Sequence, residues 1–305
     1  MLIGIDIGGT NLKSAIFKLS GEIVNKKIFK TSDPGLEKKL TKFVNQSKIK
    51  FDTGNNIFGI GISIAGLLNK KKKLVVSPNL TNFKFPEFMQ FLKREFKEVP
   101  TNVMNDANAA AIGEHTVGFK KKYRSIFLLT LGTGIGGAFI NNHSLWEGSF
   151  GTASEIGHTC IKANGNLCNC GVKGCLESYF SGWAIEKKAR RIAKLYTKSS
   201  IAKLELISPL EISNLCKLGD KRSQEIWKES GTYLGIALSN VINLINPETI
   251  ILTGGLTKAK KYFLPYTLKK CEELSLKNLY KNTNIKTGKL GIWSGTYGSI
   301  QTFVK

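Results

Sequence analysis

The chain has 305 residues, of which 42% are hydrophobic and 22% are charged. This composition is typical of a globular protein with a large core and enough length for two domains. The formal net charge of +23 comes almost entirely from scattered lysines, whereas proteins that read nucleic-acid sequence favour arginine and interleaved aromatic residues. We therefore expect a solvated, lysine-rich surface and no nucleic-acid partner.

The sequence also argues against export and membrane insertion. Asp6 interrupts the first apolar run, and no basic leader precedes it. The uncharged stretch 125–145 is rich in glycine and threonine, which argues against a membrane span. Six cysteines kept as thiols fit a reducing compartment. We expect a cytoplasmic protein with no membrane contact.

Residues 2–17 are expected to form two apolar strands joined by a glycine-rich turn. The turn residues are Gly8, Gly9 and Thr10. Backbone amides in such a turn can point at a phosphate, and Lys13 adds a positive charge. Asp6, at the end of the first strand, is well placed to hold Mg²⁺ through water. A plain hairpin with a solvated carboxylate is the alternative interpretation.

Helices and strands then alternate. We expect a helix opened by Ser32-Asp33-Pro34, a buried strand over 57–64, a helix from about Pro86 and a short strand over 102–104. Asp106 stands between that strand and an alanine-rich run, so it lies at or just before a helix N-terminus. Because a helix start favours an anion, we expect Asp106 to be ionised at neutral pH. Taken alone, it would be read as a helix cap.

The opening pattern recurs about 125 residues later. A strand over 125–131, a turn over 132–137 and a strand over 138–140 repeat the order strand, glycine turn, strand, which suggests two related domains. The turn also matches the dinucleotide fingerprint G-x-G-x-x-G. That interpretation requires a helix after the glycines, and a strand is expected there, so we discard it.

The C-terminal part is expected to be mostly helical. Helices are predicted over 183–196, from Ser208-Pro209, over 221–246, over 262–276 and over 295–303. The strand expected at 249–252 runs into Gly254 and Gly255, a third glycine turn after an apolar strand. No linker-like segment separates the two halves.

The most specific chemistry lies between residues 154 and 177. His158, Cys168, Cys170 and Cys175 make a Cys₃His set of the kind that closes a tetrahedral zinc site, and the intervening glycines allow so short a loop to fold around one ion. Ordinary buried thiols are the alternative, but three cysteines within eight residues of polar sequence disfavour it. Such a site is structural, with no open position for hydrolysis.

These features together predict phosphoryl transfer to a polyol. Three glycine turns can hold phosphates, and the reaction needs positioned phosphates, Mg²⁺ and a base for the attacking hydroxyl. A sugar would be bound by side chains rich in acceptor atoms. The chain offers Asn105, Asp106, Glu155, His158 and Glu177 for this purpose.

Five motifs resemble the ROK family of bacterial sugar kinases and related repressors. They are Asp6-x-Gly8-Gly9-Thr10-x-x-Lys13, Asn105-Asp106-Ala-Asn-Ala-Ala, Leu131-Gly-Thr-Gly-Ile-Gly-Gly137, Glu155-x-Gly157-His158 and Cys168-x-Cys170-Gly-x-x-Gly-Cys175-x-Glu177. The resemblance implies an α/β protein with an actin-like fold (hexokinase-type, ribonuclease H-like), in which two duplicated domains enclose a cleft. Placing the boundary by the repeat, we expect one domain over 1–114, completed by the C-terminal helix at about 290–305. The other spans 115–289 and carries the zinc loop 155–177.

The resemblance also implies the reaction and its residues. ATP with Mg²⁺ would phosphorylate the 6-hydroxyl of a hexose or N-acetylhexosamine, with Asp106 as base. The sugar would be held by Gly66, Asn79, Asn105, Asp106, Glu155, His158 and Glu177, where His158 serves sugar and zinc through its two ring nitrogens. The nucleotide would be held by Asp6, Gly8, Gly9, Thr10, Lys13, Gly132, Thr133, Gly134, Gly136, Gly137, Gly254 and Gly255. The partners would be a sugar and a nucleotide, and whether the chain forms a homodimer is left open.

Two departures from the family pattern matter. Ala153-Ser154 stands where Ala-Gly is usual, beside the expected sugar site, and leaves the substrate open among glucose, N-acetylglucosamine and N-acetylmannosamine. Ala138 stands where a third glycine is commoner.

A sugar-sensing repressor is the alternative, but it would need a DNA-binding module, and this sequence starts on the first strand. A non-catalytic remnant would be expected to lack Asp6, Lys13 or Asp106.

Overall fold

A computed structural model of the protein describes residues 1–51, 56–68, 74–77, 80, 83–97 and 99–304. These residues form two compact units. Unit 1 comprises Met1–Arg124, Ala138–Ala153 and Lys289–Lys305, and unit 2 comprises Ser125–Gly137 and Ser154–Gly288. The domain division expected from the sequence, with its boundary near residue 115, stays a prediction.

Unit 1 is built on a five-stranded sheet in the order β3-β2-β1-β4-β7. Its strands are β1 (Leu2–Ile7), β2 (Asn11–Phe17), β3 (Ile23–Lys30), β4 (Gly59–Ile64) and β7 (Thr101–Asn105). The first three strands are antiparallel, and β1, β4 and β7 are parallel. The carboxyl ends of the parallel strands therefore meet at one edge of the sheet, where β1 ends beside Asp6 and β7 at Asn105.

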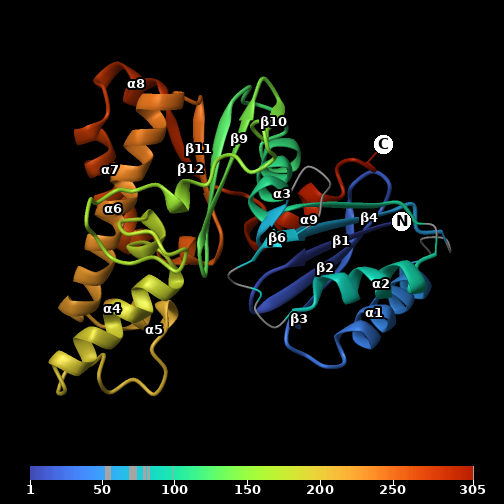
Figure 1. The fold of residues 1–305 in the computed structure, drawn as a ribbon, viewed down its shortest axis with the longest axis horizontal. Coiled ribbons are helices and arrows are strands. Elements are labelled where there is room, and N and C mark those ends of the chain that lie inside the picture. The colour runs from blue at the N-terminus through green and yellow to red at the C-terminus, as the bar shows by residue number, and fades with distance from the viewer. Residues whose placement is uncertain (52–55, 69–73, 78–79, 81–82, 98, 305) are drawn as a thin grey trace. The chain divides into compact units, whose positions relative to one another are not determined.

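One face of this sheet carries the hydrophobic core of the unit. Alternation along β1 and β4 places their isoleucines on that face, where Ile5 and Ile62 are fully buried. The helices α1 (Leu36–Phe51) and α2 (Phe85–Glu95) cover it, as Figure 1 shows. Leu40 of α1 and Leu92 of α2 belong to the same cluster. Helix α2 begins within one residue of the predicted Pro86, whereas α1 begins at Leu36, just after the predicted opening Ser32-Asp33-Pro34.

The opposite face carries a smaller apolar cluster, which includes Leu2, Phe17 and Ile300, and glycines where a helix approaches it. A Cβ on Gly4 would lie 2.7 Å from the carbonyl oxygen of Thr296, and one on Gly61 would overlap that of Ser299. Helix α9 (Ser294–Ser299) therefore rests directly on the sheet, beside α3 (Asp106–Gly113). A Cβ on Gly298 would in turn overlap the backbone of Ala109. The closing helix is shorter than the predicted 295–303, because the chain turns after Ser299.

The second five-stranded sheet has the order β10-β9-β8-β11-β12. Its strands are β8 (Ile126–Leu131), β9 (Ile135–Asn141), β10 (Ser144–Trp146), β11 (Thr249–Thr253) and β12 (Asn284–Thr287). Counted along each sheet, the order is third, second, first, fourth, fifth in both, with the last two strands parallel to the first. This shared topology confirms the duplication inferred from the two strand-turn-strand patterns.

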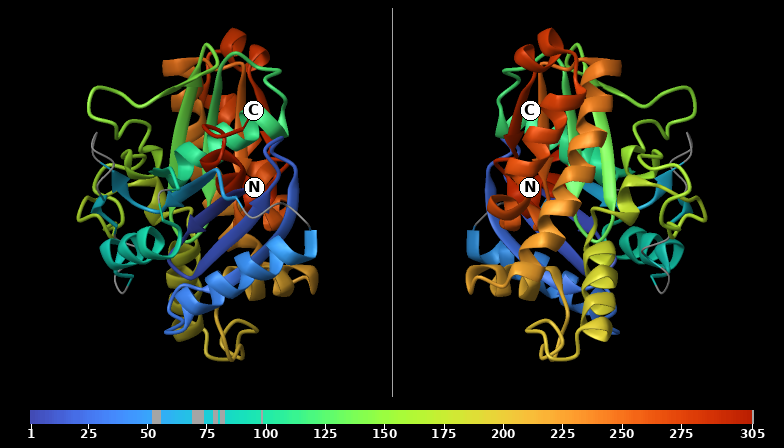
Figure 2. Two further views of the ribbon diagram at one scale, coloured as in Figure 1. Left: turned by 90° about the vertical axis from the view of Figure 1, so that its right-hand side faces the viewer. Right: turned by 90° about the vertical axis from the view of Figure 1, so that its left-hand side faces the viewer.

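The second glycine turn, predicted over 132–137, is shorter, because β9 begins at Ile135 and takes in Gly136 and Gly137. A strand follows the turn as expected, so the dinucleotide interpretation was correctly discarded. The remaining α-helices are α4 (Gly182–Leu195), α5 (Pro209–Lys217), α6 (Lys221–Ile245), α7 (Lys260–Leu274) and α8 (Lys277–Asn282). Gly231 and Gly235 let α6 pack on α7, since a Cβ on either would lie 2.5 Å from a carbonyl oxygen of that helix. Figure 2 shows α6 in orange from two sides.

Shorter elements complete the fold. They are β5 (Leu67–Leu68), β6 (Leu74–Val76), a π-helix over Glu114–Gly118 and 3₁₀ helices over Ile156–His158, Leu176–Ser178, Gly255–Ala259 and Gly291–Trp293. Over the described part of the chain, no helix is both long and apolar enough to cross a bilayer.

Candidate active site and metal centre

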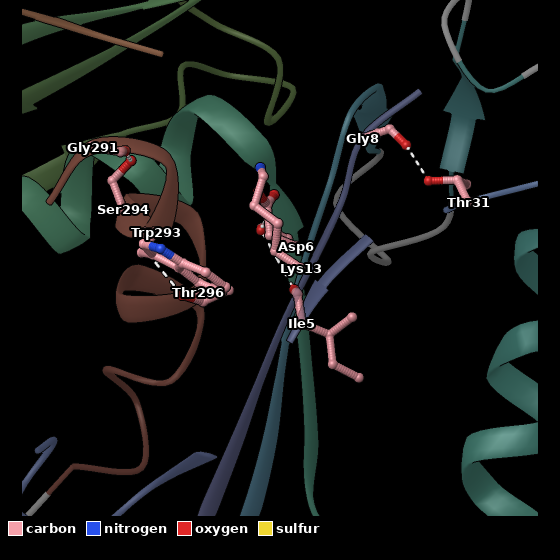
Figure 3. Close-up of polar contacts among 10 residues, drawn as sticks. Ile5, Asp6, Gly8, Lys13, Thr31, Gly291, Trp293, Ser294 and Thr296 are labelled. Carbon is pink, nitrogen blue, oxygen red and sulfur yellow. Dashed lines mark hydrogen bonds and ion pairs between the residues drawn. The ribbon is translucent and has the colours of Figure 1, made fainter. Parts of the chain in front are cut away.

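A buried charged cluster lies at the end of β1. Asp6 and Lys13 are cross-strand partners in the β1–β2 ladder, and the Lys13 ammonium donates to the Asp6 carboxylate. Ser63 Oγ of β4 donates to Asp6 Oδ1 at 2.7 Å. Figure 3 shows Asp6 and Lys13 projecting toward the segment that carries Ser294, with Ile5 on the other side of the strand. Alternation thus sends the isoleucines into the core and the carboxylate to the glycine-lined face.

Asp106 begins helix α3 but does not cap it. The side chain of Asn105 accepts hydrogen bonds from the amides of Ala107, at 2.9 Å, and Asn108, at 3.1 Å, and so is the N-cap. The Asn105 amide group also donates to the carbonyl oxygen of Gly66 at 3.0 Å, which ties the helix start to the end of β4. The simplest structural role for Asp106 is therefore already filled by its neighbour.

The protonation of Asp106 differs from the sequence expectation. Burial, and then the negative charge of Asp6, raise the pKa of Asp106 from its usual 3.8 to about 7. The backbone amide of Ala107 and the ammonium of Lys13 lower the pKa, but they do not compensate. With a pKa of about 7, Asp106 is only partly ionised at neutral pH, so the prediction that it is ionised there is wrong. The helix start alone suggested it, and the loss of water and the second carboxylate outweigh that effect.

A carboxyl group with a pKa near 7 is suited to proton transfer. General bases work best when their pKa lies near the operating pH, because they are then both available and sufficiently basic. The two carboxyl groups lie in unequal environments: Asp6 is paired with Lys13, whereas burial raises the pKa of Asp106. Such pairs are typical of acid–base sites.

The first glycine turn holds itself together through its own backbone. The amide of Gly8 donates to Asn11 O at 3.0 Å, and Gly8 O accepts from Thr31 Oγ1 at 2.9 Å (Figure 3). The Gly8 amide therefore closes the turn rather than pointing at an anion, contrary to expectation. Nucleotide binding by Gly8, Gly9 and Thr10 stays a prediction. Asn79, expected to bind sugar from this part of the chain, lies outside the described residues.

The second and third glycine turns of unit 2 lie against each other. Gly254 adopts φ +96°, and a Cβ there would lie 2.5 Å from the carbonyl oxygen of Leu131, directly before the second turn. The amide of Gly182, the first residue of α4, donates to Gly132 O at 2.9 Å. Gly136 donates from its amide to Thr130 Oγ1 at 3.1 Å. These contacts place two of the three predicted phosphate turns in one region.

The four predicted metal ligands converge. The ligand atoms of His158, Cys168, Cys170 and Cys175 all lie within 4.8 Å of one another. The sulfurs of Cys170 and Cys175 are 3.7 Å apart, close to the roughly 3.8 Å expected for two thiolates on one tetrahedral zinc. His158 presents Nδ1 to Cys168 Sγ at 3.9 Å. The donor set and its spacing fit a closed structural zinc site.

Glu177 connects this centre to the second glycine turn. One carboxylate oxygen accepts from the amide of Ile135 at 2.8 Å, and the other accepts from the indole of Trp183 at 3.2 Å. Cys168 Sγ lies 4.0 Å from the same carboxylate. Sugar binding by Glu177 stays a prediction, and its observed contacts make it a structural link as well.

The loop that leads into the centre fixes Glu155 and His158. Glu155 has φ −71° and ψ 58°, and the amide of Ile156 donates to Ser154 O at 2.7 Å, which is an inverse γ-turn. The amide of His158 then donates to Glu155 O at 3.0 Å and closes a turn of 3₁₀ helix. The backbone of both residues is thus held by a short, hydrogen-bonded stretch.

Comparison with known proteins identifies the family. The model of the ROK family matches residues 2–304. The chain belongs to the ROK family.

ROK relatives of two kinds are similar to this chain. A glucokinase of Halalkalibacterium halodurans is 29% identical over 97% of this chain and 92% of its own length. A xylose repressor of Bacillus subtilis is 32% identical over 84% of this chain, but the match spans only 65% of the repressor.

Solved ROK structures share the fold. The crystal structure of a ROK glucokinase from Streptomyces griseus, in complex with glucose and AMPPNP, superposes with a TM-score of 0.79 at 27% identity, over 98% of this chain and 97% of that one. The chain accordingly has the actin-like α/β fold expected from its motifs.

Two residues of the site were not predicted from the sequence. Ser63 donates to Asp6, and Thr130 accepts from the amide of Gly136 in β9. Each is a lone hydroxyl residue in an otherwise apolar strand that ends at a predicted site. In the strand 59–64, that contrast is a signal that the sequence does carry.

Proposed function

We propose that this chain is an ATP-dependent sugar kinase that transfers the γ-phosphoryl group to the 6-hydroxyl of a hexose or N-acetylhexosamine. The observation that carries the proposal is Asp106. It stands at a helix start that Asn105 already caps, and its pKa is about 7. Family membership and the glucokinase relatives support the same activity.

In this mechanism Asp106 accepts the proton of the sugar hydroxyl as the phosphoryl group arrives. Asp6 and Lys13 would serve the phosphate side, where the Lys13 ammonium offsets negative charge. Asp6 has the oxygen ligands that Mg²⁺ prefers, and Mg²⁺ bound there through water would neutralise the phosphates of ATP. The Glu155 carboxylate would accept hydrogen bonds from sugar hydroxyls, and the His158 ring would donate one.

Zinc would contribute structure rather than chemistry. Four protein ligands close its coordination, so it would hold the loop that carries His158 and Glu177. The contact of Glu177 with the Ile135 amide extends this support to the second glycine turn. The centre would thereby position groups for both substrates.

A coupled ADP-release assay over free sugars tests the proposal. Purified protein is supplied with ATP and Mg²⁺ and, in turn, glucose, mannose, N-acetylglucosamine and N-acetylmannosamine, with xylose, which has no 6-hydroxyl, as the negative control. We expect ADP release that depends on at least one six-carbon sugar. Sugar binding without any ADP release would contradict the proposal and favour the repressor-type role of the xylose-repressor relative.

A further inference from the structure

Glu114 is a buried carboxylate outside the groups proposed to bind the substrates. It follows helix α3 and begins the π-helix over Glu114–Gly118, and its side chain is fully buried. Burying a carboxylate is costly unless hydrogen bonds satisfy it. A π-helix is rare and frequently lies at a functional site. The fold therefore retains an expensive group here, which calls for a specific task.

Both oxygens of the Glu114 carboxylate hold one short stretch of backbone. Oε2 accepts from the amide of Lys289 at 2.8 Å, and Oε1 accepts from the amide of Leu290 at 2.9 Å. These are the first two residues of the last segment of unit 1, which carries α9. A Cβ on Gly118 would lie 2.3 Å from Oε2, so the glycine leaves room for the carboxylate. Glu114 thus clamps the beginning of the segment that carries α9.

Helix α9 follows shortly after the clamped residues and reaches Asp6. A Cβ on Gly295 would lie 3.0 Å from Asp6 Oδ1 and 2.9 Å from Ser63 Oγ. Figure 3 shows Asp6 projecting toward the segment that carries Ser294. A Cβ on Gly113, the last residue of α3, would lie 2.3 Å from the carbonyl oxygen of Ser294. The backbone of α9 is therefore in close contact both with α3 and with the end of the strand that carries Asp6.

Because α9 lies against Asp6, its position affects how much water reaches the carboxyl pair of the site. Asp106, the first residue of α3, owes its raised pKa first to burial and then to the charge of Asp6. Both effects weaken when water enters, since water solvates the charged form and screens a neighbouring charge. In the described part of the chain, the charged side chains of Asp6 and Lys13 act on Asp106, and that of Lys289 acts on Glu114.

We propose that Glu114 is a positioning residue, whose carboxylate keeps α9 against Asp6 and thereby limits the access of water to Asp6 and Asp106. This inference rests on the proposed kinase function, in which Asp106 is the base. Glu114 acts through α9 and not on a substrate. Without the clamp, α9 should move away from the end of β1, water should enter, and Asp106 should become a weaker base. A weaker base accepts the proton of the sugar less readily, so kcat should fall.

Two substitutions release the clamp in different ways. Glu114→Gln keeps the shape but replaces one acceptor oxygen with an amino group, which cannot accept from a backbone amide. Gly118→Ala keeps the carboxylate but adds a methyl group 2.3 Å from the position of Oε2, so the carboxylate must move. Leu40→Ala is the control. It removes a buried side chain on the opposite face of the same sheet, so it should lower the Tm without loosening α9.

The pH profile of kcat/KM distinguishes positioning from support of the fold alone. With the sugar found in the ADP-release assay, the midpoint of the acid limb should move to lower pH by about one pH unit in Glu114→Gln and in Gly118→Ala. At pH 8, kcat should fall about threefold or more in both variants, while the sugar Kd changes little. Leu40→Ala should keep the wild-type midpoint. An unchanged midpoint in both clamp variants would overturn the role of Glu114 while the kinase stands.

Asp106→Asn, combined with each clamp variant, gives a readout that needs no activity. It should gain stability relative to its parent between pH 5 and pH 8, because only the parent loses the stabilisation linked to the Asp106 proton. In the Glu114→Gln and Gly118→Ala parents this gain, measured by urea unfolding, should be about half of that in the wild type. A wild type that phosphorylates no sugar would overturn the kinase and leave this comparison intact. Equal gains in all three parents would refute the clamp.

Discussion

The raised pKa of Asp106 should affect stability as well as catalysis. Its pKa is about 7 in the folded protein against an ordinary value of 3.8, so the folded state binds the proton more tightly than the unfolded chain does. The resulting stabilisation is fully present below pH 3.8 and is lost as the pH rises toward 7. Asp106→Asn, which cannot ionise, should remove this pH dependence.

We therefore expect Asp106→Asn to gain stability relative to the wild type on going from pH 5 to pH 8. Urea unfolding of both proteins at the two pH values measures the difference. Asn105→Ala is the matched control, because it removes the actual cap and should cost about 1 kcal/mol at both pH values. An equal stability difference between Asp106→Asn and the wild type at pH 5 and pH 8 would show that the Asp106 pKa is not raised.

At the scale of elements, the contact between α9 and the first sheet depends on missing side chains. A Cβ on Gly61 would overlap the carbonyl oxygen of Ser299, and one on Gly295 would lie 3.0 Å from Asp6 Oδ1. We expect Gly61→Ala to lower the free energy of unfolding by about 1–3 kcal/mol, because α9 must move away from the sheet. Denaturant unfolding measures the loss. Gly255→Ala, where a Cβ would meet nothing within 4 Å, should change it by less than about 0.5 kcal/mol.

The loop that carries the four metal ligands should affect both zinc binding and substrate binding. Cys170→Ser removes one of four zinc ligands and should weaken zinc binding by about 100-fold or more. Because Glu177 joins this loop to Ile135, we expect the KM for ATP to rise together with the KM for sugar. Elemental analysis should find one zinc per wild-type chain. Cys160→Ser, outside the ligand set, should keep its zinc and its activity; a zinc-free Cys170→Ser protein with wild-type KM values would refute the link.

For the molecule as a whole, sequence periodicity predicted most of the architecture. Apolar runs ending in glycine located β1, β8 and β11, and the pair Ser208-Pro209 located the start of α5, where Ser208 is the N-cap. The strand β3 was missed because its lysines make it a polar, partly exposed edge strand. Edge strands lack the alternation that burial imposes on the others.

The candidate site was predictable where chemistry depends on spacing and not where it depends on surroundings. The four metal ligands converge as their spacing implied. The raised pKa of Asp106 was missed, because Asp6 is a hundred residues away in the sequence and only the fold joins their charges. The left-handed backbone of Ser154, with φ +69°, likewise required the structure, although its place in a glycine position was visible from the motif.

The most direct test of Asp106 as the catalytic base compares the wild type and Asp106→Asn, with the sugar found in the ADP-release assay as substrate. Asparagine keeps the shape and the hydrogen bonding to sugar but cannot accept the proton. We predict that kcat falls by about 10²- to 10⁴-fold while the sugar Kd, measured by calorimetry, changes little. In the wild type, kcat/KM should fall as the pH drops below about 7, because protonated Asp106 is inactive as a base. Near-normal turnover in Asp106→Asn would contradict the account and leave Asp106 a residue of structure alone.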